Sequence, residues 1–573
     1  MSAKRKKKVE KKPEEKPWYK FYPPGVRRHI VYPEIPLHEL LRNAAQKYAD
    51  KTAIIYFDRK ISYKELNMLT DKFAASLANL GIKKGDKVAI LLPNIPQFVI
   101  SYYGTLKAGA VVTTINPLYK EREVEHQLND SEAETIVVLD LVYPIVEKIW
   151  EKTKLGNVIV TSIKDYMPPF KAALGSLLGK VPTRKVRQKT NLYFFTELIA
   201  KYEATPPKVE INPKDDLAAL QYTGGTTGIS KGAMLTHMNL VSNALMCKEW
   251  LQASEGEEVV LAALPLFHIY GMTTSMNAPI SFAGAMVLLP RFDPANALQA
   301  IQKYRVTVFC GVPTMYAMLL THPKLKKYNL NSIKFCVSGA APLPPEIQKK
   351  FIEVTGGVLV EGYGLTEASP ITHVNPFDKS MRTVKIGSIG IPWPDTDAKI
   401  VDMETGEREL PPGEVGELVV KGPQVMKGYW KMPEETSAVL RNGWLYTGDI
   451  GKMDEEGYFY ITDRKKDLIK FKGYSVYPRE LEDVLYEHPA VKLCCVVGKP
   501  DPVAGEVPKA FVVLKEGVTA TEEELMRFVN ERVAPYKAIR ELELRTELPL
   551  SAVGKVLRRV LREEEIRKAA AKT

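Results

Sequence analysis

The sequence predicts an α/β fold, with a large N-terminal domain of β-sheets flanked by helices and a small α+β domain at the C-terminus. In the first half of the chain, short apolar runs such as "KTAIIYF" and "KVAILLP" alternate with amphipathic helical runs, as in largely parallel sheets. After residue 467 the pattern changes to a compact series of helix, strand, strand and helix. The length of 573 residues also exceeds what one ordinary hydrophobic core supports, so we expect at least two domains.

The clearest early helix covers residues 62–81. Apolar residues recur in it at intervals of three and four, which places them on one face that can pack against a sheet. In the C-terminal part, "RELEDVLYEHP" and "EEELMRFVNERV" read as helices, and "KLCCVVG" and "KAFVVLK" between them read as strands. The stretch "DRKKD", residues 463–467, lies between the two patterns and is the expected domain boundary. The apolar face of the early helix consists of Leu66, Leu69, Phe73, Leu77 and Leu80.

The net charge of +12 is concentrated near the N-terminus. Residues 1–17 hold eight Lys or Arg and three Glu, a net +5, which leaves +7 for the other 556 residues. So small an excess, with both signs interspersed, argues against a nucleic-acid partner. The tail lacks the apolar stretch of a secretory signal. We expect it to be disordered, with attraction to an anionic surface as the alternative.

Five cysteines are present and form no CxxC pair, which argues against a zinc site or a disulfide framework. A reduced compartment, the cytoplasm, fits this pattern best. The cysteines are Cys247, Cys310, Cys336, Cys494 and Cys495.

Two stretches raise the question of a membrane. Residues 269–290 contain no charge and are long enough to cross a bilayer, but Gly271, Pro279 and Gly284 suit a buried helix, turn and strand better. Residues 168–189 put Phe170, Leu174, Leu177 and Leu178 on one helical face, directly before a basic run. An apolar face beside basic residues is typical of a helix on an anionic bilayer surface. A surface helix packed on its own domain is the alternative.

The stretch "YTGGTTGISKG", Tyr222–Gly232, is rich in glycine, threonine and lysine, a composition that can bring backbone N–H groups and hydroxyls around a phosphate. A Walker A loop requires Gly-x-x-x-x-Gly-Lys-Ser/Thr, whereas here Lys231 follows Ser230 and precedes Gly232. The loop is therefore not the signature of a P-loop NTPase. It follows a strand-like run, "DLAALQY", and the next helix is expected to begin with Thr236 as its N-cap.

The loop is followed, in order, by four further motifs: "EGYGLTEASP", "GWLYTGDIG", "DRKKDLIKFKGYSVYPRELE" and "SAVGKVLRR". Together the five resemble the AMP-forming adenylate-forming superfamily over roughly residues 35–560, most closely bacterial-type fatty-acid–CoA ligases. The resemblance implies that a fatty acid reacts with ATP to give an acyl adenylate and pyrophosphate, and that coenzyme A then displaces AMP. Such a reaction needs no enzyme nucleophile, so it depends on positioning and charge neutralisation.

The resemblance also assigns roles by position. The loop Thr223, Gly224, Gly225, Thr226, Thr227, Gly228 and Lys231 would wrap the β- and γ-phosphates. Tyr363 would face the adenine, Thr366 would bind the α-phosphate, and Glu367, with Thr227, would hold Mg²⁺. Asp449 would bind the ribose, Arg464 would reach the same ribose or the phosphate, and Lys555 would bridge the carboxylate and α-phosphate. Further expected ATP-binding residues are Gly339, Ala340, Ala341, Glu361, Gly362, Gly364 and Ile461.

The family rotates its small domain between the two half-reactions, and the resemblance places Lys466 at the hinge. The rotation would move Lys555 away and bring Lys470, Lys472 and Gly473 to coenzyme A, with Arg291 near one of its phosphates. The expected parts are therefore a basic disordered tail over residues 1–22, a large ATP- and acyl-binding domain over 23–462, a hinge over 463–467, and a small mobile domain over 468–573.

The acyl substrate is the least specified feature. His268 occupies the position beside the acyl carboxylate, with walls expected from Tyr270, Met272, residues 311–318 and residues 338–343. These walls hold no acid to meet an amino group, which argues against an amino-acid-activating domain. Met272 stands where some long-chain ligases carry a gating tryptophan, so aryl acids stay open as an alternative. A fatty-acyl-AMP ligase is the other alternative. We expect a cytoplasmic monomer or homodimer, with a peripheral contact to an anionic membrane through residues 168–189 and the tail as an open alternative.

Overall fold

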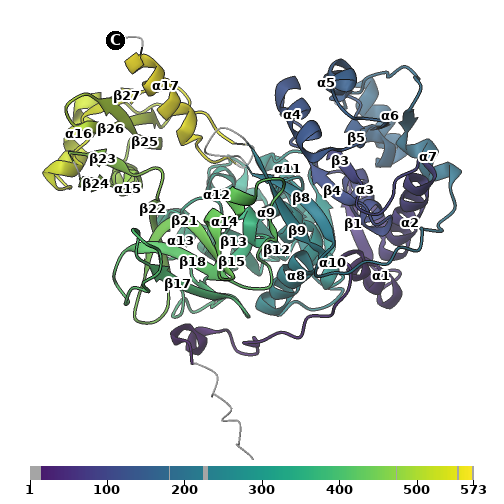
Figure 1. Ribbon diagram of the computed structural model, residues 1–573, viewed down its shortest axis with the longest axis horizontal. Coiled ribbons are helices and arrows are strands. Elements are labelled where there is room, and N and C mark those ends of the chain that lie inside the picture. The colour runs from purple at the N-terminus through teal and green to yellow at the C-terminus, as the bar shows by residue number, and fades with distance from the viewer. Residues whose placement is uncertain (1–14, 180, 224–229, 473, 552–553, 571–573) are drawn as a thin grey trace, which may run out of the picture.

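The computed structural model describes residues 15–179, 181–223, 230–472, 474–551 and 554–570. The chain folds into a large part that carries three sheets and a small C-terminal part that carries a fourth (Figure 1). The expected α/β fold is confirmed. The small part lies at the upper left in Figure 1 and joins the large part through β22 (Phe459–Arg464).

The first sheet of the large part has nine strands in the described residues and is mainly parallel, with antiparallel pairing at both ends. Parallel pairing of β10 with β11 and of β12 with β13 brings chain segments far apart in sequence to one edge. In order across the sheet, the strands are β16 (Ile391–Pro392), β15 (Ile371–Val374), β14 (Val358–Gly364), β13 (Phe335–Ser338), β12 (Val308–Gly311), β10 (Val259–Ala262), β11 (Ala285–Leu288), β1 (Thr52–Tyr56) and β2 (Arg59–Ser62).

The second sheet is parallel from β8 to β7, and the strand that follows the phosphate-type loop pairs antiparallel at its edge. In order, its strands are β19 (Gly428–Tyr429), β9 (Lys231–Thr236), β8 (Leu217–Thr223), β4 (Val111–Thr114), β3 (Lys87–Leu91), β5 (Thr135–Leu139), β6 (Asn157–Thr161) and β7 (Leu192–Phe194).

The third sheet and the sheet of the small part are mostly antiparallel, which the sequence did not predict. The third contains β17 (Asp397–Val401), β18 (Gly416–Lys421), β20 (Leu440–Arg441), β21 (Trp444–Met453) and β22; the fourth contains β23 (Ile469–Phe471), β24 (Tyr474–Val476), β25 (Val491–Asp501), β26 (Gly505–Leu514) and β27 (Glu541–Leu544).

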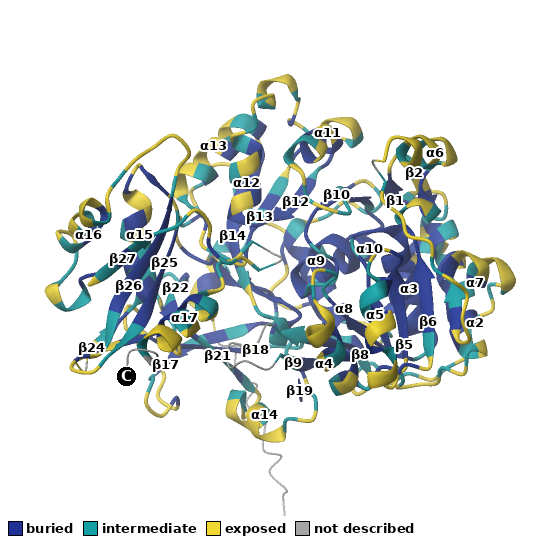
Figure 2. Cartoon of the chain, turned by 90° about the horizontal axis from the view of Figure 1, so that it is seen from above, coloured by how far each residue is buried: buried dark blue, intermediate teal, exposed yellow. Residues whose placement is uncertain are grey.

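Helices cover the sheets with apolar faces inward, so that sheets and buried helix faces are blue in Figure 2. In α2 the buried residues include Leu66, Leu69, Phe73 and Leu77, the face that the periodicity predicts. The helices of the large part are α1 (His38–Lys47), α2 (Tyr63–Asn79), α3 (Pro96–Lys107), α4 (Glu121–Ser131), α5 (Tyr143–Ile149), α6 (Pro169–Leu177), α7 (Phe195–Lys201), α8 (His237–Leu251), α9 (Ile269–Met272), α10 (Ala278–Ser281), α11 (Pro294–Tyr304), α12 (Pro313–Leu320), α13 (Pro345–Thr355) and α14 (Pro433–Val439).

The small part contains α15 (Pro478–Glu487) and α16 (Glu522–Asn530), at or near the expected positions, and α17 (Arg558–Ala570). It has hydrophobic cores of its own, which include Ile469, Leu481 and Val512, separate from the core of the large part. A separate core is what a unit needs to move as a body.

The N-terminal segment differs from the expectation of a tail that extends to residue 22. Residues Pro17–Phe21 form a 3₁₀ helix whose Trp18 is buried against Phe459, at 6.1 Å between ring centroids. The Tyr22 hydroxyl donates to the Pro392 carbonyl at 2.8 Å. Burial of Trp18 and the hydrogen bond of Tyr22 hold this segment on the large part, although its composition is basic. Residues 1–14 lie outside the described residues.

The uncharged stretch 269–290 is buried and forms α9, a π-helical turn (Thr273–Asn277), α10 and β11, as expected. Among the described residues, no helix has both the length and the apolar character needed to span a bilayer.

Candidate active site

Asp449 is the centre of a polar cluster between the third sheet and β14. It lies on β21 opposite Arg464 of β22, and its carboxylate is 2.9 Å from Arg464 Nε. The Tyr363 hydroxyl donates to the other carboxylate oxygen at 2.5 Å. Asp449 is buried, so these two partners compensate the loss of its hydration. The negative charge of Asp449 raises the pKa of Arg464, which stays a cation.

Lys555 comes to this cluster from the small part, about a hundred positions after Asp449 and Arg464 in the sequence. It lies in the loop before α17, where the Lys555 N–H donates to Ser551 Oγ at 3.1 Å. The preceding Gly554 touches the large part, since a Cβ there would be 3.0 Å from Thr314 Oγ1. The positive charge of Arg464, followed by desolvation, lowers the pKa of Lys555 to about 7. The expected catalytic lysine therefore shares an electrostatic environment with Arg464 and Asp449.

Lys466 lies in the turn after β22, within the expected hinge. Desolvation and then the charge of Arg464 lower its pKa to about 8. Arg562 of α17 donates to the Lys466 carbonyl at 3.0 Å. Ile461, earlier on β22, is half-buried and pairs with Gly451.

The motif "EGYG" occupies the end of β14 and requires glycine for steric reasons. A Cβ at Gly364 would lie 2.2 Å from the Pro370 carbonyl oxygen, and one at Gly362 would lie 2.9 Å from Val337 Cγ1. Glu361 is buried and accepts from the Leu343 N–H at 3.1 Å, while desolvation raises its pKa to about 7. This bond ties β14 to the loop that carries Gly339, Ala340 and Ala341.

Thr366 and Glu367 follow in a short 3₁₀ helix (Thr366–Ala368) and are half-buried. Glu367 accepts from the Tyr429 hydroxyl at 2.6 Å. Lys231 of β9 lies 5.2 Å from the centroid of the same tyrosine ring and pairs with Glu435. Glu367, Tyr429 and Lys465 also line a cavity of about 250 Å³. The structure thus joins Lys231 and Glu367 through Tyr429.

The loop before Lys231 is only partly described. Ser230 Oγ donates to the Thr223 carbonyl at 2.5 Å and closes the base of the loop, where β8 and β9 pair. The expected loop residues Gly224, Gly225, Thr226, Thr227 and Gly228, and Gly473 in the small part, lie outside the described residues.

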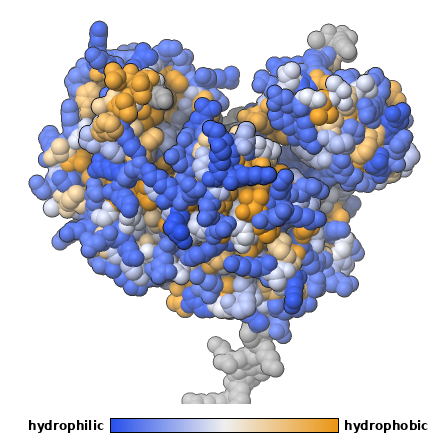
Figure 3. Space-filling view, turned by 180° about the vertical axis from the view of Figure 1, so that it is seen from behind, coloured by the Kyte–Doolittle hydropathy of each residue, from blue (hydrophilic) through white to orange (hydrophobic). Residues whose placement is uncertain are grey.

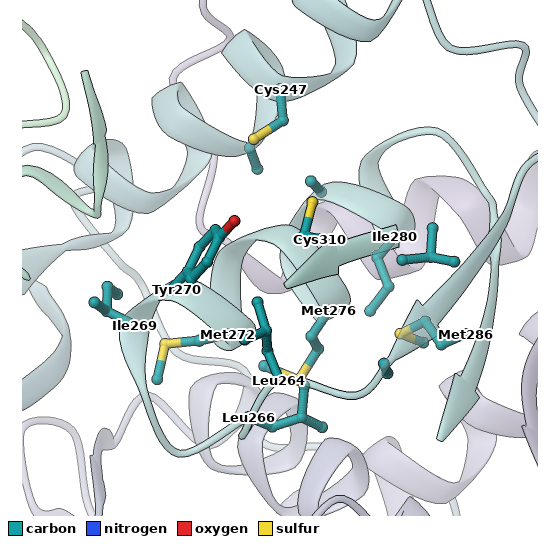
Figure 4. Packing of buried hydrophobic residues seen from close by; sticks show 14 of the residues in the cluster. Cys247, Leu264, Leu266, Ile269, Tyr270, Met272, Met276, Ile280, Met286 and Cys310 are labelled. Atoms are coloured by element: carbon teal, nitrogen blue, oxygen red, sulfur yellow. The ribbon is translucent and has the colours of Figure 1, made fainter. Parts of the chain in front are cut away.

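His268 is half-buried and lies directly before the buried helix α9. Its Nδ1 accepts from the Tyr270 N–H at 3.3 Å, and desolvation, with the charge of Lys555, lowers its pKa to about 4. The imidazole is therefore neutral at pH 7, with the proton on Nε2. Tyr270 packs beneath Gly339 and donates to the Val337 carbonyl at 3.0 Å. Figure 4 shows the side chains beyond it, among them Met272, Met276, Met286, Cys247 and Cys310.

Three expected residues lie apart from the cluster. Arg291 is exposed between β11 and α11. Lys470 and Lys472 are exposed on the hairpin of β23 and β24, at the outer edge of the small part in Figures 1 and 2. Lys470 Nζ donates to Ser475 Oγ at 2.8 Å within that hairpin.

Sequence reasoning missed two side chains that hold the cluster in place. Tyr429 lies in "GYWK", outside the five motifs, and reads as a core aromatic. Glu417 is buried, accepts from the Gly448 N–H at 3.0 Å and pairs with Lys465 at 3.0 Å. It thereby fixes the turn before Asp449 to the segment after Arg464. The signal available in the sequence was a glutamate, Glu417, beside the apolar residues of β18.

Comparison with known proteins agrees with this arrangement. The family model of AMP-binding enzymes matches residues 41–430, and that of the AMP-binding enzyme C-terminal domain matches residues 480–555. A long-chain-fatty-acid–CoA ligase from Bacillus subtilis (strain 168) is 50% identical over 559 residues, covering 96% of this chain and 98% of that protein. One from Escherichia coli O6:H1 is 40% identical over 562 residues, covering 96% of this chain and 98% of that protein.

A solved structure of ATP-bound MatB from Rhodopseudomonas palustris superposes with a TM-score of 0.81 at 32% identity, covering 92% of this chain and 99% of the other. Its fold therefore extends over both parts of the chain described above. With both family models matched in register and half of all residues shared with a full-length relative, the chain belongs to the AMP-binding enzymes.

Proposed function

We propose that the protein is an ATP-dependent, AMP-forming fatty-acid–CoA ligase whose substrates are medium- to long-chain acids. The observation that carries the proposal is the cluster of Asp449, Arg464 and Tyr363, in which Arg464 and Asp449 also act electrostatically on Lys555 of the small part. The names of the two relatives support a fatty-acid substrate. ATP and coenzyme A are the two other substrates, and the cytoplasm is the proposed location, where all five cysteines stay free and buried.

In the first half-reaction, a fatty-acid carboxylate oxygen attacks the α-phosphorus of ATP, and the bond to the β-phosphate oxygen breaks to release pyrophosphate. Lys555 would bridge the carboxylate and the α-phosphate, and Thr366 would donate to that phosphate. Asp449 would accept from the ribose hydroxyls and Tyr363 would face the adenine. These groups hold the reactants in line and offset negative charge, which is the chief catalytic need of such a displacement.

Thr223, Lys231 and the loop between them would hold the leaving pyrophosphate. Lys231 is suited to this role because its ammonium group lies on the Tyr429 ring, close to Glu367. The neutral His268 would donate from Nε2 to the acyl carboxylate, which orients the acid without adding a second positive charge beside Lys555.

Magnesium fits the residues beside the cavity. Among the described residues, no cluster of three or more His, Cys, Asp or Glu could hold a metal ion alone. Glu367 supplies one half-buried carboxylate, and Mg²⁺ in nucleotide sites typically takes one or two carboxylates plus phosphate oxygens and water. Glu367, with Thr227, would hold the ion, which when bound would offset the charge of the triphosphate.

In the second half-reaction, the thiolate of coenzyme A attacks the acyl carbonyl carbon and AMP leaves. We infer that the small domain, residues 468–573, turns about residues 463–467 between the steps. Lys555 is coupled electrostatically to Arg464 and Asp449, while Lys470 and Lys472 are exposed on the hairpin of β23 and β24, which supports our assignment of this structure to the adenylation arrangement. The turn would bring Lys470, Lys472 and Gly473 toward coenzyme A, and Arg291 would meet one of its phosphates.

The apolar side chains that follow His268 support the assignment of an acid with a flexible aliphatic chain as the substrate. Unbranched methionines are among these side chains, and their thioether groups change rotamer at little cost. Met272 is fully buried and accepts from the Tyr102 hydroxyl at 3.4 Å. We infer that these side chains give way to the acyl chain without a tryptophan gate.

A panel of carboxylic acids tests the proposal. Purified protein is mixed with ATP, Mg²⁺, coenzyme A and one acid from a series that runs from acetate through palmitate to cinnamate, and acyl-CoA and pyrophosphate are measured. We expect the highest kcat/KM among the medium- to long-chain acids. An optimum at cinnamate would assign an aryl-acid ligase instead. Pyrophosphate and acyl adenylate without acyl-CoA would assign a fatty-acyl-AMP ligase, and phosphate release without acid would exclude both.

We further propose that α6 and the basic run after it, residues 168–189, contact an anionic membrane. None of the described residues of α6 is buried, and Phe170, Leu174, Leu177 and Leu178 are 76%, 43%, 83% and 55% exposed. They form the apolar patch at the upper left in Figure 3. Arg184, Lys185 and Arg187 follow, all exposed. The protein would act there as a monomer or homodimer.

A further inference from the structure

Arg558, the first residue of α17, lies three positions after Lys555 and contacts three carboxylates. Its guanidinium donates to Asp467 at 3.0 Å and to both oxygens of Glu482, at 2.6 and 2.7 Å. Its Nη1 is also 3.7 Å from Asp463 Oδ1. The Arg558 side chain is 21% exposed, so these charges pair largely out of water.

The carboxylates that contact Arg558 lie on different sides of the domain boundary. Glu482 lies on α15, whose Leu481 and Leu485 are in the core of the small domain, so its bond to Arg558 is internal to that domain. Asp463 lies on β22, which pairs with β21 of the large domain through Ile450. The Arg558–Asp463 pair is therefore a contact that crosses the hinge.

Asp463 makes a second contact of the same kind. Its Oδ2 accepts from the Arg479 N–H at 2.8 Å, in the first turn of α15, where helix N–H groups lack intrahelical partners. The side chain of Asp463 is 1% exposed. A turn of the small domain about residues 463–467 would take both Arg558 and the α15 N-terminus away from this buried carboxylate.

The loop that carries Lys555 is short and closed at its base beside Arg558. The Leu557 N–H donates to the Pro549 carbonyl at 2.8 Å, and Ser551 N–H donates to the Lys555 carbonyl at 2.7 Å. A residue that fixes position 558 therefore also fixes the direction of Lys555. Misplacement of a reacting group by an ångström is enough to lose much of its effect.

We propose that Arg558 is a positioning residue for the first half-reaction: by pairing with Asp463 across the hinge, it holds Lys555 over the α-phosphate. The proposal rests on the proposed function for the identity of the two half-reactions. The pairs with Glu482 and Asp467 serve to hold Arg558 itself in place.

The test separates the half-reactions in the full-length protein. Adenylation is followed as palmitate-dependent ATP–pyrophosphate exchange, and thioester formation as palmitoyl-CoA produced from supplied palmitoyl adenylate and coenzyme A. Arg558→Gln is expected to slow exchange by about tenfold or more while thioester formation changes by less than about threefold. The matched control is Arg559→Gln, because Arg559 is exposed and pairs only at 3.7 Å with Glu563 of its own helix. It should leave both rates unchanged.

A double-mutant cycle distinguishes positioning from stability. Asp463→Asn keeps an oxygen for the Arg479 N–H and loses the charge, so it should slow exchange selectively and add little to Arg558→Gln. Glu482→Gln weakens a contact that holds Arg558 within the small domain, so it should lower thermal stability and slow exchange less than Arg558→Gln does. If Arg558→Gln does not fold, the selectivity of Asp463→Asn decides alone.

Equal loss of both half-reactions in Asp463→Asn, or additive effects of Arg558→Gln and Asp463→Asn on exchange, would overturn the inference. Failure of the proposed function would show differently, because the unmodified protein would then catalyse no exchange with palmitate or any other fatty acid.

Discussion

At the scale of single residues, the charge of Lys555 is set by its neighbours rather than by its own chemistry. A free lysine has a pKa near 10.4, whereas the charge of Arg464 and desolvation bring that of Lys555 to about 7. Asp449 acts in the opposite direction on the same group. Asp449 thus pairs with Arg464 and also favours the charged form of Lys555, so a change at Asp449 alters both cations.

This balance predicts the pH dependence of adenylation. Lys555 is a cation below its pKa, so the fraction of free enzyme that can neutralise the reacting carboxylate and phosphate falls as pH rises above about 7. We expect kcat/KM for ATP in pyrophosphate exchange to fall at alkaline pH, with a limiting slope of about tenfold per pH unit. In Lys555→Arg the guanidinium stays charged, so the alkaline decrease of kcat/KM should begin more than about one pH unit higher. A wild-type rate that is flat from neutral to alkaline pH would contradict the assignment.

At the scale of elements, the segment around the phosphate-type loop differs from the simple strand–loop–helix that its sequence suggests. The run "KGAMLT" forms β9, which pairs antiparallel with β8, so Lys231 lies at the start of a strand. Gly232 allows this pairing, because a Cβ there would lie 3.2 Å from the ring of Tyr222. The expected N-cap of α8 is confirmed: Thr236 Oγ1 accepts from the Asn239 N–H at 3.2 Å, and the Asn239 side chain returns a bond to Thr236.

Removal of this cap gives a prediction about stability. Thr236→Ala deletes the acceptor for one N–H of the first turn of α8, which should lower the free energy of unfolding by about 1 kcal/mol. The measurement is the midpoint of the first urea transition, followed by far-ultraviolet circular dichroism. Thr183→Ala, at an exposed loop position, is the matched control and should leave the midpoint unchanged. Identical midpoints for the two variants would show that the cap does not stabilise α8.

At the scale of the whole molecule, α6 and the small domain lie at opposite ends (Figure 1). Lys171 of α6 pairs with Asp58, and Gly175 lies against Val181, so one side of the helix is anchored while its apolar residues face outward. A membrane contact at this end would leave the small domain free to turn.

The membrane contact is tested with vesicles. The double variant Leu174→Asp/Leu177→Asp should bind vesicles of phosphatidylglycerol and phosphatidylcholine at least about tenfold more weakly. Leucine side chains that would insert between the lipids are replaced by carboxylates that anionic lipid repels. Binding is measured by sedimentation, and activity toward octanoate in the absence of vesicles should not change. Val503→Asp, an exposed apolar residue of the small domain, is the control. Equal binding of the double variant and the unmodified protein would exclude α6 as the contact.

The sequence by itself determined the α/β class, the helix faces, the small C-terminal domain and the family, because periodicity and motifs are local properties of the chain. It predicted the apolar face of α2 and the cap at Thr236 from residues a few positions apart. It did not predict the antiparallel third sheet, the burial of Trp18, or the roles of Tyr429, Glu417 and Arg558.

Those features depend on contacts between residues far apart in sequence. Only the tertiary structure brings Arg464 beside Asp449 and Lys555 beside Arg464, and only there do burial and neighbouring charge set the pKa values. The position of the small domain is likewise decided by a few ion pairs and hydrogen bonds across residues 463–467, which no local pattern encodes. A sequence pattern specifies which groups are available, whereas distance and desolvation, which fix the strength of their interaction, exist only in the folded chain.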